Sequence, residues 1–261
     1  MPEGPEVKTT VDFLKNYENK KLISITVLSG RYTKKPIDNI NNPSWRLPLN
    51  LESVNCKGKF IYFSLQDDVF FFNTLGMTGM WTNNISNHSR IKLEFEDEVI
   101  PLYYNDTRNF GTFKIALRKK DLDKKLKSLG PDFLKDGWGP ETFYKLLQKK
   151  PNKTITEFLM NQKNVSGIGN YLKAECLYDA KISPHRFCCH ITAKEADRLF
   201  HSCRRIIQLS YKTGGATIQN YRKPNGKKGL YSQRFAVYNQ KTAPCGNQVI
   251  KEKTLDKRTT H

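Results

Sequence analysis

The sequence predicts an α+β protein in two parts, an antiparallel β-sandwich that follows one N-terminal helix, and a helical domain that ends in a β-hairpin. Three observations support this. Alternating β-branched and aromatic residues dominate the first half of the chain. A stretch rich in glycine and proline follows at 129–141. Beyond it, apolar residues recur at helical spacing.

The first helix is expected at 5–18, because Pro5 suits the first helical position and Glu6 complements the helix dipole. A capping box of Thr192 and Glu195 begins the last long helix, which ends at Gly214. Strands are expected at 22–28, 58–65, 69–75, 90–95 and 112–117, and further helices within 141–150, 154–162 and 171–181. The predicted domains are 1–129, a linker at 130–140, a helical domain at 141–215, and a hairpin-like segment at 216–261.

The positive charge is concentrated near the end of the chain. The net charge is +19, and residues 201–261 carry 13 Lys/Arg against 2 Asp/Glu. This concentration favours a surface that binds a polyanion, most simply nucleic acid, over a merely solvated basic tail. No apolar run of 18 residues and no secretory signal occur, so we expect neither a membrane span nor secretion.

The cysteines indicate a reducing compartment, nuclear or cytoplasmic. None of the six, at 56, 176, 188, 189, 203 and 245, forms a C-x-x-C pair. A zinc site built from His185, Cys188, Cys189, His190 and Cys203 is an alternative, but it lacks a second tight ligand pair. We therefore expect no metal and no cofactor.

The chain begins MPEGPEV, and residues 2 and 3 are not explained by helix capping. If Met1 is removed, Pro2 presents a secondary amine with a pKa of about 8, so part of it is nucleophilic at neutral pH. Attack of this amine on a sugar C1′ yields an iminium ion that cannot lose an N–H proton and remains an electron sink. Glu3, next in the chain, is placed to move a proton.

Together with several later motifs, MPEGPEV resembles the formamidopyrimidine-DNA glycosylase/endonuclease VIII family of base-excision repair enzymes. The resemblance covers nearly the whole chain and assigns the catalytic N-terminus to Pro2 and Glu3. In GKF at 58–60, Lys59 matches the family's strand lysine, which contacts the DNA backbone and assists catalysis. Without the other motifs, Lys59 would be read as an ordinary exposed strand lysine.

Two further motifs, LGMTG at 75–79 and YNDTRNFG at 104–111, match the segments that fill the gap left by a flipped nucleotide. The resemblance assigns this role to Met77, Arg108 and Phe110. An apolar wedge and an arginine recover part of the stacking and pairing that flipping costs. A methionine or a phenylalanine in strand-rich sequence is more often a core residue, so only the combination of the three residues supports this role.

The segment SGIGNYLKAECLYDAKISPHR at 166–186 resembles the family's helix–two-turn–helix, so 141–215 becomes a DNA-binding domain. Its glycine turn is expected to offer backbone amides to a phosphate, with Asn170 capping the helix and contacting DNA. Glu175 is expected to organise this DNA-binding site. The loop that follows Gly214 resembles the lesion-recognition loop, in which Thr217 and Tyr221 would contact the flipped base; a basic loop without base contact is the alternative.

The last motif departs from the family pattern. Many members end in a four-cysteine zinc finger, a hairpin that places an arginine on the phosphates beside the lesion. Here only Cys245 remains, and Thr242 stands where its partner is expected. KRTT at 257–260 still matches the arginine turn, which gives Arg258 the phosphate-binding role in a zincless finger.

These resemblances imply a bifunctional DNA glycosylase and AP lyase, acting as a monomer on duplex DNA that contains oxidised bases or abasic sites. Oxidised purines such as 8-oxoguanine and formamidopyrimidines are expected ahead of oxidised pyrimidines and hydantoins. The strand would be cut by β,δ-elimination through the Pro2 Schiff base. A catalytically silent lesion-binding protein on the same fold is the alternative.

Overall fold

The structure, a computed structural model, describes residues 2–217 and 221–261 and divides into two compact units. The first comprises Pro2, Glu6–Ser128 and the described part of Ala216–Gly229. The second comprises Glu3–Pro5, Leu129–Gly215 and Leu230–His261. The chain passes from the first unit to the second between Ser128 and Leu129, and the described part of the loop at 216–229 belongs to the first unit. The domain boundaries at 129–130, 140–141 and 215–216 stay a prediction.

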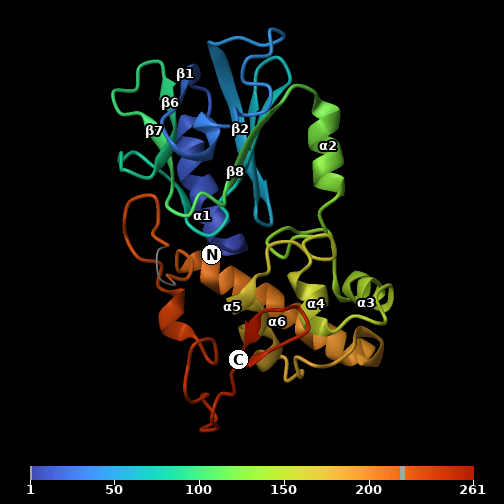
Figure 1. The fold of residues 1–261 in the computed structure, drawn as a ribbon. Helices are drawn as coiled ribbons and strands as arrows, with labels where there is room; N and C mark the ends of the chain where they lie inside the picture. Colours follow the sequence, from blue (N-terminus) through green and yellow to red (C-terminus); the bar gives the residue numbers. More distant parts are fainter. Residues whose placement is uncertain (1, 218–220) are drawn as a thin grey trace. The chain divides into compact units, whose positions relative to one another are not determined.

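The described part of the first unit contains most of α1 (Gly4–Leu14), α2 (Lys119–Lys127), two 3-10 turns and an antiparallel sheet (Figure 1). The 3-10 turns are Lys15–Tyr17 and Gly30–Thr33. The strands are β1 (Lys21–Val27), β2 (Leu49–Lys57), β3 (Phe60–Leu65), β4 (Val69–Thr74), β5 (Gly79–Thr82), β6 (Ser89–Phe95), β7 (Leu102–Asp106) and β8 (Thr112–Ala116).

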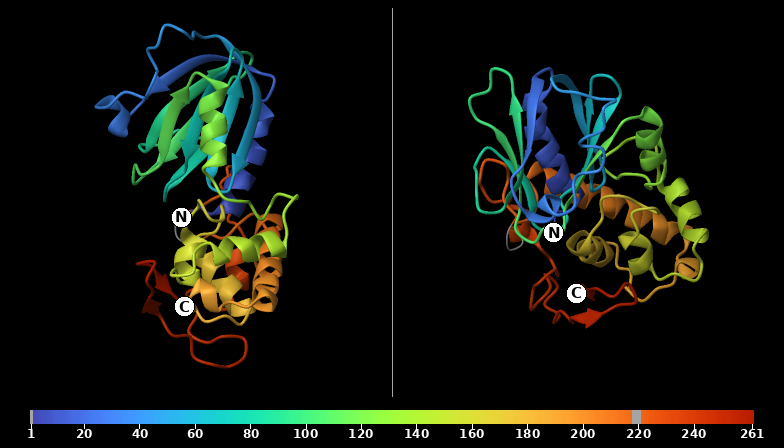
Figure 2. Two further views of the ribbon diagram at one scale, coloured as in Figure 1. Left: turned by 90° about the vertical axis from the view of Figure 1, so that its right-hand side faces the viewer. Right: turned by 45° about the horizontal axis from the view of Figure 1, so that its top comes forward.

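The sheet folds over one core, which confirms the α+β class. Its strand order is β5-β7-β6-β1-β2-β3-β4-β8, and the pairing of β1 with β2 covers only two residue pairs. The two halves face each other across this narrow junction (Figure 2). Trp81 of β5 packs on Phe63 of β3 with ring centroids 5.5 Å apart, and its indole N–H donates to Asn73 of β4. The sandwich is therefore one hydrogen-bonded sheet bent onto itself, not two separate sheets.

The helix α1 closes this core because its apolar residues recur every three or four positions. Val7, Val11 and Leu14 are buried with the strand residues. Five of the strands lie where the sequence predicts them, whereas β2, β5 and β7 were not expected. In β2, the alternation of apolar and polar residues shifts at Ser53, where the pairing with β3 is irregular. Strand β7 is buried along its whole length, so neither strand shows an unbroken period-two pattern.

The described part of the second unit is mainly helical, with a short two-stranded hairpin. The elements are α3 (Pro140–Gln148), α4 (Ile155–Met160), α5 (Asn170–Asp179), α6 (Ala193–Lys212), 3-10 turns at Cys188–His190 and Tyr231–Arg234, β9 (Glu252–Lys253) and β10 (Thr259–Thr260). The capping box at the start of α6 is confirmed, because Thr192 and Glu195 exchange both bonds. Within 216–261, the described residues show hairpin pairing between β9 and β10 and an isolated antiparallel bridge between Thr242 and Gln248. The described part of 216–240 is largely irregular rather than hairpin-like.

Two features shape the core of this second unit. Phe133, Phe143 and Phe200 form an aromatic cluster with centroids 5.5–6.1 Å apart. Helix α5 is buried on every side from Tyr171 to Leu177, including the charged residues Lys173 and Glu175. A helix that buries charged residues must supply a partner for each of them. Across the described residues, we find no helix long and apolar enough to cross a membrane.

Candidate active site

Pro2 lies in the wall of a pocket in the first unit. The pocket has a volume of about 200 Å³. Its wall brings together residues from separate parts of the sequence: Pro2, Met77, His88, Asn105, Tyr221 and Arg222. Three of these, Pro2, Met77 and Tyr221, were predicted as site residues from three different motifs. Met1, whose removal the chemistry requires, lies outside the described residues.

Glu3 is anchored to the N-terminus of α5 in the second unit. Its side chain is buried, and the carboxylate accepts hydrogen bonds from the backbone N–H groups of Gly169 at 2.7 Å, Tyr171 at 3.0 Å and Leu172 at 3.3 Å. A helix N-terminus attracts negative charge, so this arrangement is favourable. A Cβ at position 169 would clash with the Glu3 carboxyl group, which explains the glycine.

This anchor corrects two expectations about the turn before α5. The backbone amides of the glycine turn at the helix start were expected to bind a phosphate, but those of Gly169, Tyr171 and Leu172 bind the carboxylate of Glu3. Asn170 does not cap the helix, because Gly169 occupies the cap position and Asn170 is already helical. Its side-chain amide instead donates to the backbone oxygen of Thr259, 2.8 Å away.

A second buried glutamate holds the base of the loop that follows α6. The Glu6 carboxylate accepts from the backbone N–H of Ala216 at 2.7 Å. The Thr217 hydroxyl accepts from the N–H of Gly229 at 2.8 Å, so the loop is closed at its base. Burial, with Glu6 nearby, raises the pKa of Tyr221, which keeps this phenol protonated. Residues 218–220 of the predicted lesion-recognition loop lie outside the described residues.

The three residues predicted to fill the gap in DNA lie on two adjoining turns. Met77 is 36% exposed between β4 and β5, and Phe110 is 54% exposed between β7 and β8. The Arg108 guanidinium lies 4.8 Å from the centroid of the Phe110 ring, within cation–π range. Exposed apolar side chains next to an arginine are suited to contact unpaired bases.

Asp106, which the sequence analysis missed, ties these turns together. Its side chain is buried and accepts from the Thr78 hydroxyl and from the backbone N–H of Gly111. The Thr78 hydroxyl in turn accepts from the N–H of Arg108 at 2.9 Å. A Cβ on Gly111 would clash with the Tyr104 hydroxyl, so the close approach requires glycine. The signal available in sequence is an acid directly before the turn TRNFG.

Lys59 lies in a turn and not on a strand, contrary to the expectation. Gly58 has a φ of +57° and, with Lys59, forms the two-residue turn between β2 and β3. Glycine adopts this left-handed conformation readily, so the GKF segment closes a hairpin. Lys59 is half-buried there.

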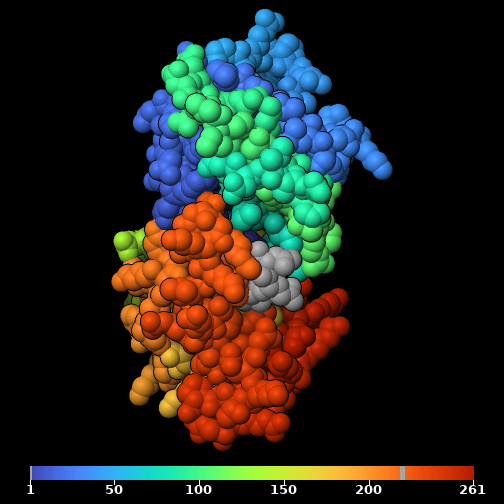
Figure 3. Space-filling model, turned by 90° about the vertical axis from the view of Figure 1, so that its left-hand side faces the viewer, coloured from blue at the N-terminus to red at the C-terminus, as the bar shows by residue number. Residues whose placement is uncertain are grey.

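Glu175 and Arg258 lie in the second unit in contrasting environments. Both Glu175 oxygens are buried and accept from the backbone N–H groups of residues 236, 237 and 238 at 2.8–2.9 Å. This arrangement supports an organising role and leaves no exposed carboxylate for DNA. Arg258 is exposed at the turn between β9 and β10. In the view of Figure 3, the C-terminal segment that carries Arg258 is coloured red and lies at the surface.

The cysteines are all free thiols. Among residues 2–217 and 221–261, no group of three His, Cys, Asp or Glu side chains is arranged to hold a metal ion. Cys188 and Cys203 of the alternative zinc site are buried, whereas Cys189 is exposed.

Comparisons with known proteins agree with this geometry. The formamidopyrimidine-DNA glycosylase N-terminal domain matches residues 1–113, and the formamidopyrimidine-DNA glycosylase H2TH domain matches 129–222. The formamidopyrimidine-DNA glycosylase of Ureaplasma parvum is 34% identical over 94% of this chain and 91% of its own length. That of Oceanobacillus iheyensis is 30% identical over 100% of this chain and 95% of its own.

Two solved structures show the same fold. The MutM (Fpg) protein from Thermus thermophilus superposes with a TM-score of 0.87 at 28% identity, covering 100% of this chain and 96% of that one. The Lactococcus lactis Fpg in complex with DNA containing an abasic site gives a TM-score of 0.85 at 27% identity, covering 99% and 97%.

The fold, with its bent sheet and its helix–two-turn–helix domain, defines a DNA-binding enzyme of base-excision repair. The chain belongs to the formamidopyrimidine-DNA glycosylase family. It is therefore a DNA N-glycosylase with AP lyase activity, as the resemblance in sequence implied.

The anchoring of the turns by Asp106 generates the first prediction. Asp106→Asn replaces one acceptor oxygen with a donor, so either Thr78 or Gly111 loses its partner. We expect a loss of about 1–3 kcal/mol in the free energy of unfolding, measured by urea denaturation, together with slower base excision. Glu52→Gln, at an exposed position of β2, is the matched control. An unchanged denaturation midpoint for Asp106→Asn would contradict the anchoring role.

Proposed function

We propose that this chain excises oxidised bases from duplex DNA with the Pro2 amine and then cuts the strand by β,δ-elimination. The observation that carries the proposal is the pocket, in which Pro2 lines the same wall as Met77 and Tyr221. A pocket of about 200 Å³ beside Pro2 is large enough for a base turned out of the helix.

The chemistry begins with attack of the Pro2 nitrogen on C1′, which forms a carbon–nitrogen bond while the bond to the base breaks. The departing base takes up a proton, and the proline nitrogen loses its own. The C1′–O4′ bond then breaks as O4′ takes up a proton, so the sugar ring opens and an iminium ion between Pro2 and C1′ remains. This iminium ion acidifies the hydrogen on C2′. Loss of that proton expels the 3′ phosphate, and a second elimination expels the 5′ phosphate. Glu3, adjacent to Pro2 in the chain, is the group proposed to move protons in these steps.

DNA is held by residues outside this pocket. Met77, Arg108 and Phe110 would occupy the gap left by the flipped nucleotide, and Lys59 and Arg258 would contact the backbone. Asn170 is proposed to assist from the start of α5. Cationic contacts of this kind release counterions, so the affinity for DNA should fall steeply as salt rises.

Oxidised purines, including 8-oxoguanine and formamidopyrimidines, are the proposed substrates ahead of oxidised pyrimidines and hydantoins. The gap-filling set and the loop after α6 are similar to those of the 8-oxoguanine branch, although PEGPE together with a zincless finger is closer to endonuclease VIII-like members. The relatives' names agree, and one Lactococcus lactis Fpg variant was solved with DNA containing Fapy-dG. A monomer in a reducing intracellular compartment and the zincless-finger subgroup stay predictions.

Borohydride trapping on a duplex with an abasic site tests the Schiff base. We expect a covalent adduct that maps to residue 2, less adduct from Pro2→Gly, whose amine is primary, and none from a form that retains Met1. A correctly processed protein that binds this DNA but forms no adduct would contradict the proposed Schiff base at Pro2.

Removal of one gap-filling ring should separate base flipping from strand cutting. Phe110→Ala is expected to slow excision of 8-oxoguanine by about tenfold or more, because stacking lost on flipping is no longer replaced. Cleavage at a preformed abasic site should change less, since there is no base to flip. Val99→Ala, another exposed apolar truncation in the first unit, is the control. Equal losses on both substrates would argue against the gap-filling role.

A lesion panel under single-turnover conditions tests substrate choice. We expect faster excision of 8-oxoguanine opposite cytosine than of thymine glycol opposite adenine, because the gap-filling set and loop are similar to those of the 8-oxoguanine branch. The reverse order would assign the chain to oxidised pyrimidines.

A further inference from the structure

Lys173 is a fully buried lysine in the middle of α5. Its ammonium group lies 2.6 Å from the Asp256 carboxylate, and the two side chains are 0% and 3% exposed. A buried charge is costly unless it is paired, so each of these residues needs the other. The pair joins helix α5 to the turn between β9 and β10.

Asp256 also organises the turn that carries Arg258. The carboxylate oxygen that does not face Lys173 accepts from the Thr254 hydroxyl at 2.6 Å and from the backbone N–H of Arg258 at 3.2 Å. The backbone N–H of Thr254 donates to the oxygen of Arg258 at 3.1 Å. Lys257, between Asp256 and Arg258, has a φ of +60°, which is uncommon for residues other than glycine.

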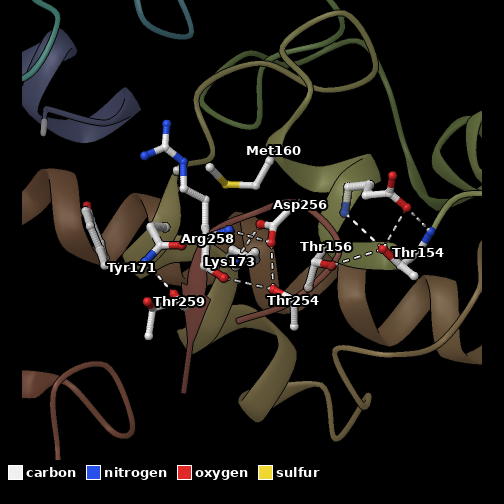
Figure 4. A network of polar contacts seen from close by, with 12 residues as sticks. Thr154, Thr156, Met160, Tyr171, Lys173, Thr254, Asp256, Arg258 and Thr259 are labelled. Atoms are coloured by element: carbon white, nitrogen blue, oxygen red, sulfur yellow. Dashed lines mark hydrogen bonds and ion pairs between the residues drawn. The ribbon is translucent and has the colours of Figure 1, made fainter. Parts of the chain in front are cut away.

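The polar network continues to the start of α5. Figure 4 shows Lys173, Asp256, Thr254 and Arg258 together, with the Arg258 side chain extending away from the ion pair. The Asn170 side-chain amide donates to the backbone oxygen of Thr259, the residue that follows Arg258, whereas Asp256 holds the chain before Arg258. The backbone of Arg258 is thus held from both sides while its guanidinium is left exposed.

We propose that the Lys173–Asp256 ion pair positions Arg258 for its contact with a DNA phosphate. The pair would hold this hairpin in place, as four cysteines and a metal do in other family members. Lys173 and Asp256 are positioning residues, and the inference rests on the proposed phosphate-binding role of Arg258. Two strands of two residues each are too short to hold the hairpin by their own pairing.

The electrostatics of the pair are consistent with this role. Burial lowers the pKa of Lys173, and the Asp256 carboxylate opposes that effect. Burial acts to raise the pKa of Asp256, but hydrogen bonds from Lys173 and Thr254 leave it below its usual value. Neutralising Asp256 therefore makes it easier for Lys173 to lose its proton, so Asp256→Asn need not leave an unpaired charge in the interior. Lys173→Met leaves the Asp256 carboxylate without its cation, so it should destabilise the hairpin more than Asp256→Asn.

The test compares Lys173→Met, Asp256→Asn and Arg258→Ala by their affinity for abasic-site DNA at several salt concentrations. Arg258→Ala should bind about tenfold more weakly and reduce the slope of log affinity against log salt by about one. Lys173→Met should have the same effect and add no further loss to Arg258→Ala in the double variant. Asp256→Asn keeps an acceptor for the backbone N–H of Arg258, so its affinity for DNA should lie between those of the unaltered protein and Lys173→Met. It replaces Lys173→Met in the test if that variant fails to fold.

Two measurements separate positioning from general stability. Amide hydrogen exchange across 252–260, without DNA, should be faster in Lys173→Met and Asp256→Asn. Leu199→Ala, a buried truncation on α6, should lower the melting temperature yet leave that exchange and the salt slope unchanged.

An Arg258→Ala variant with unaltered binding would overturn the phosphate role together with this inference. If Arg258→Ala weakens binding while folded Lys173→Met and Asp256→Asn match the unaltered protein, only the positioning role fails.

Discussion

The hydrogen bonds between Glu3 and the first turn of α5 are the contact on which the candidate active site depends. Three backbone N–H groups converge on one buried carboxylate, and the helix dipole favours its charge. Because Glu3 follows Pro2 directly, the backbone leading to the proposed nucleophile is fixed within one residue of it. Reactions at a terminal amine require such fixing, since free chain ends are otherwise poorly ordered.

Buried acids hold four of the candidate functional segments of this basic protein. Asp106 holds the gap-filling turns, Glu6 the loop after α6, Glu175 the segment at 236–238, and Asp256 the turn of Arg258. Each accepts from backbone N–H groups, which have fixed directions and lose no side-chain entropy. A chain of net charge +19 thereby uses several of its 25 Asp and Glu residues internally, away from the phosphates that its exposed cations are expected to meet.

The sequence motifs identify the family, but several of their contacts were assigned to the wrong partner. The amides at the start of α5 were expected to bind a phosphate and instead bind Glu3. Asn170 was expected to cap the helix and instead donates to the backbone oxygen of Thr259. A motif shows that donors are present at a helix start. It cannot show which acceptor reaches them, because Glu3 and Gly169 are 166 residues apart in the chain.

The sequence by itself determined the α+β class, the family, the amphipathic helix α1, the capping box of α6 and the choice of Pro2 as the candidate nucleophile. These follow from periodicity, local hydrogen-bonding chemistry and motif order, which act over a few residues. Only the tertiary structure decided that α5 is buried on all sides, that Asp106 holds two turns, and that Lys173 pairs with Asp256. Each depends on a partner brought close by folding, and an isolated acid or lysine in sequence is equally compatible with solvent.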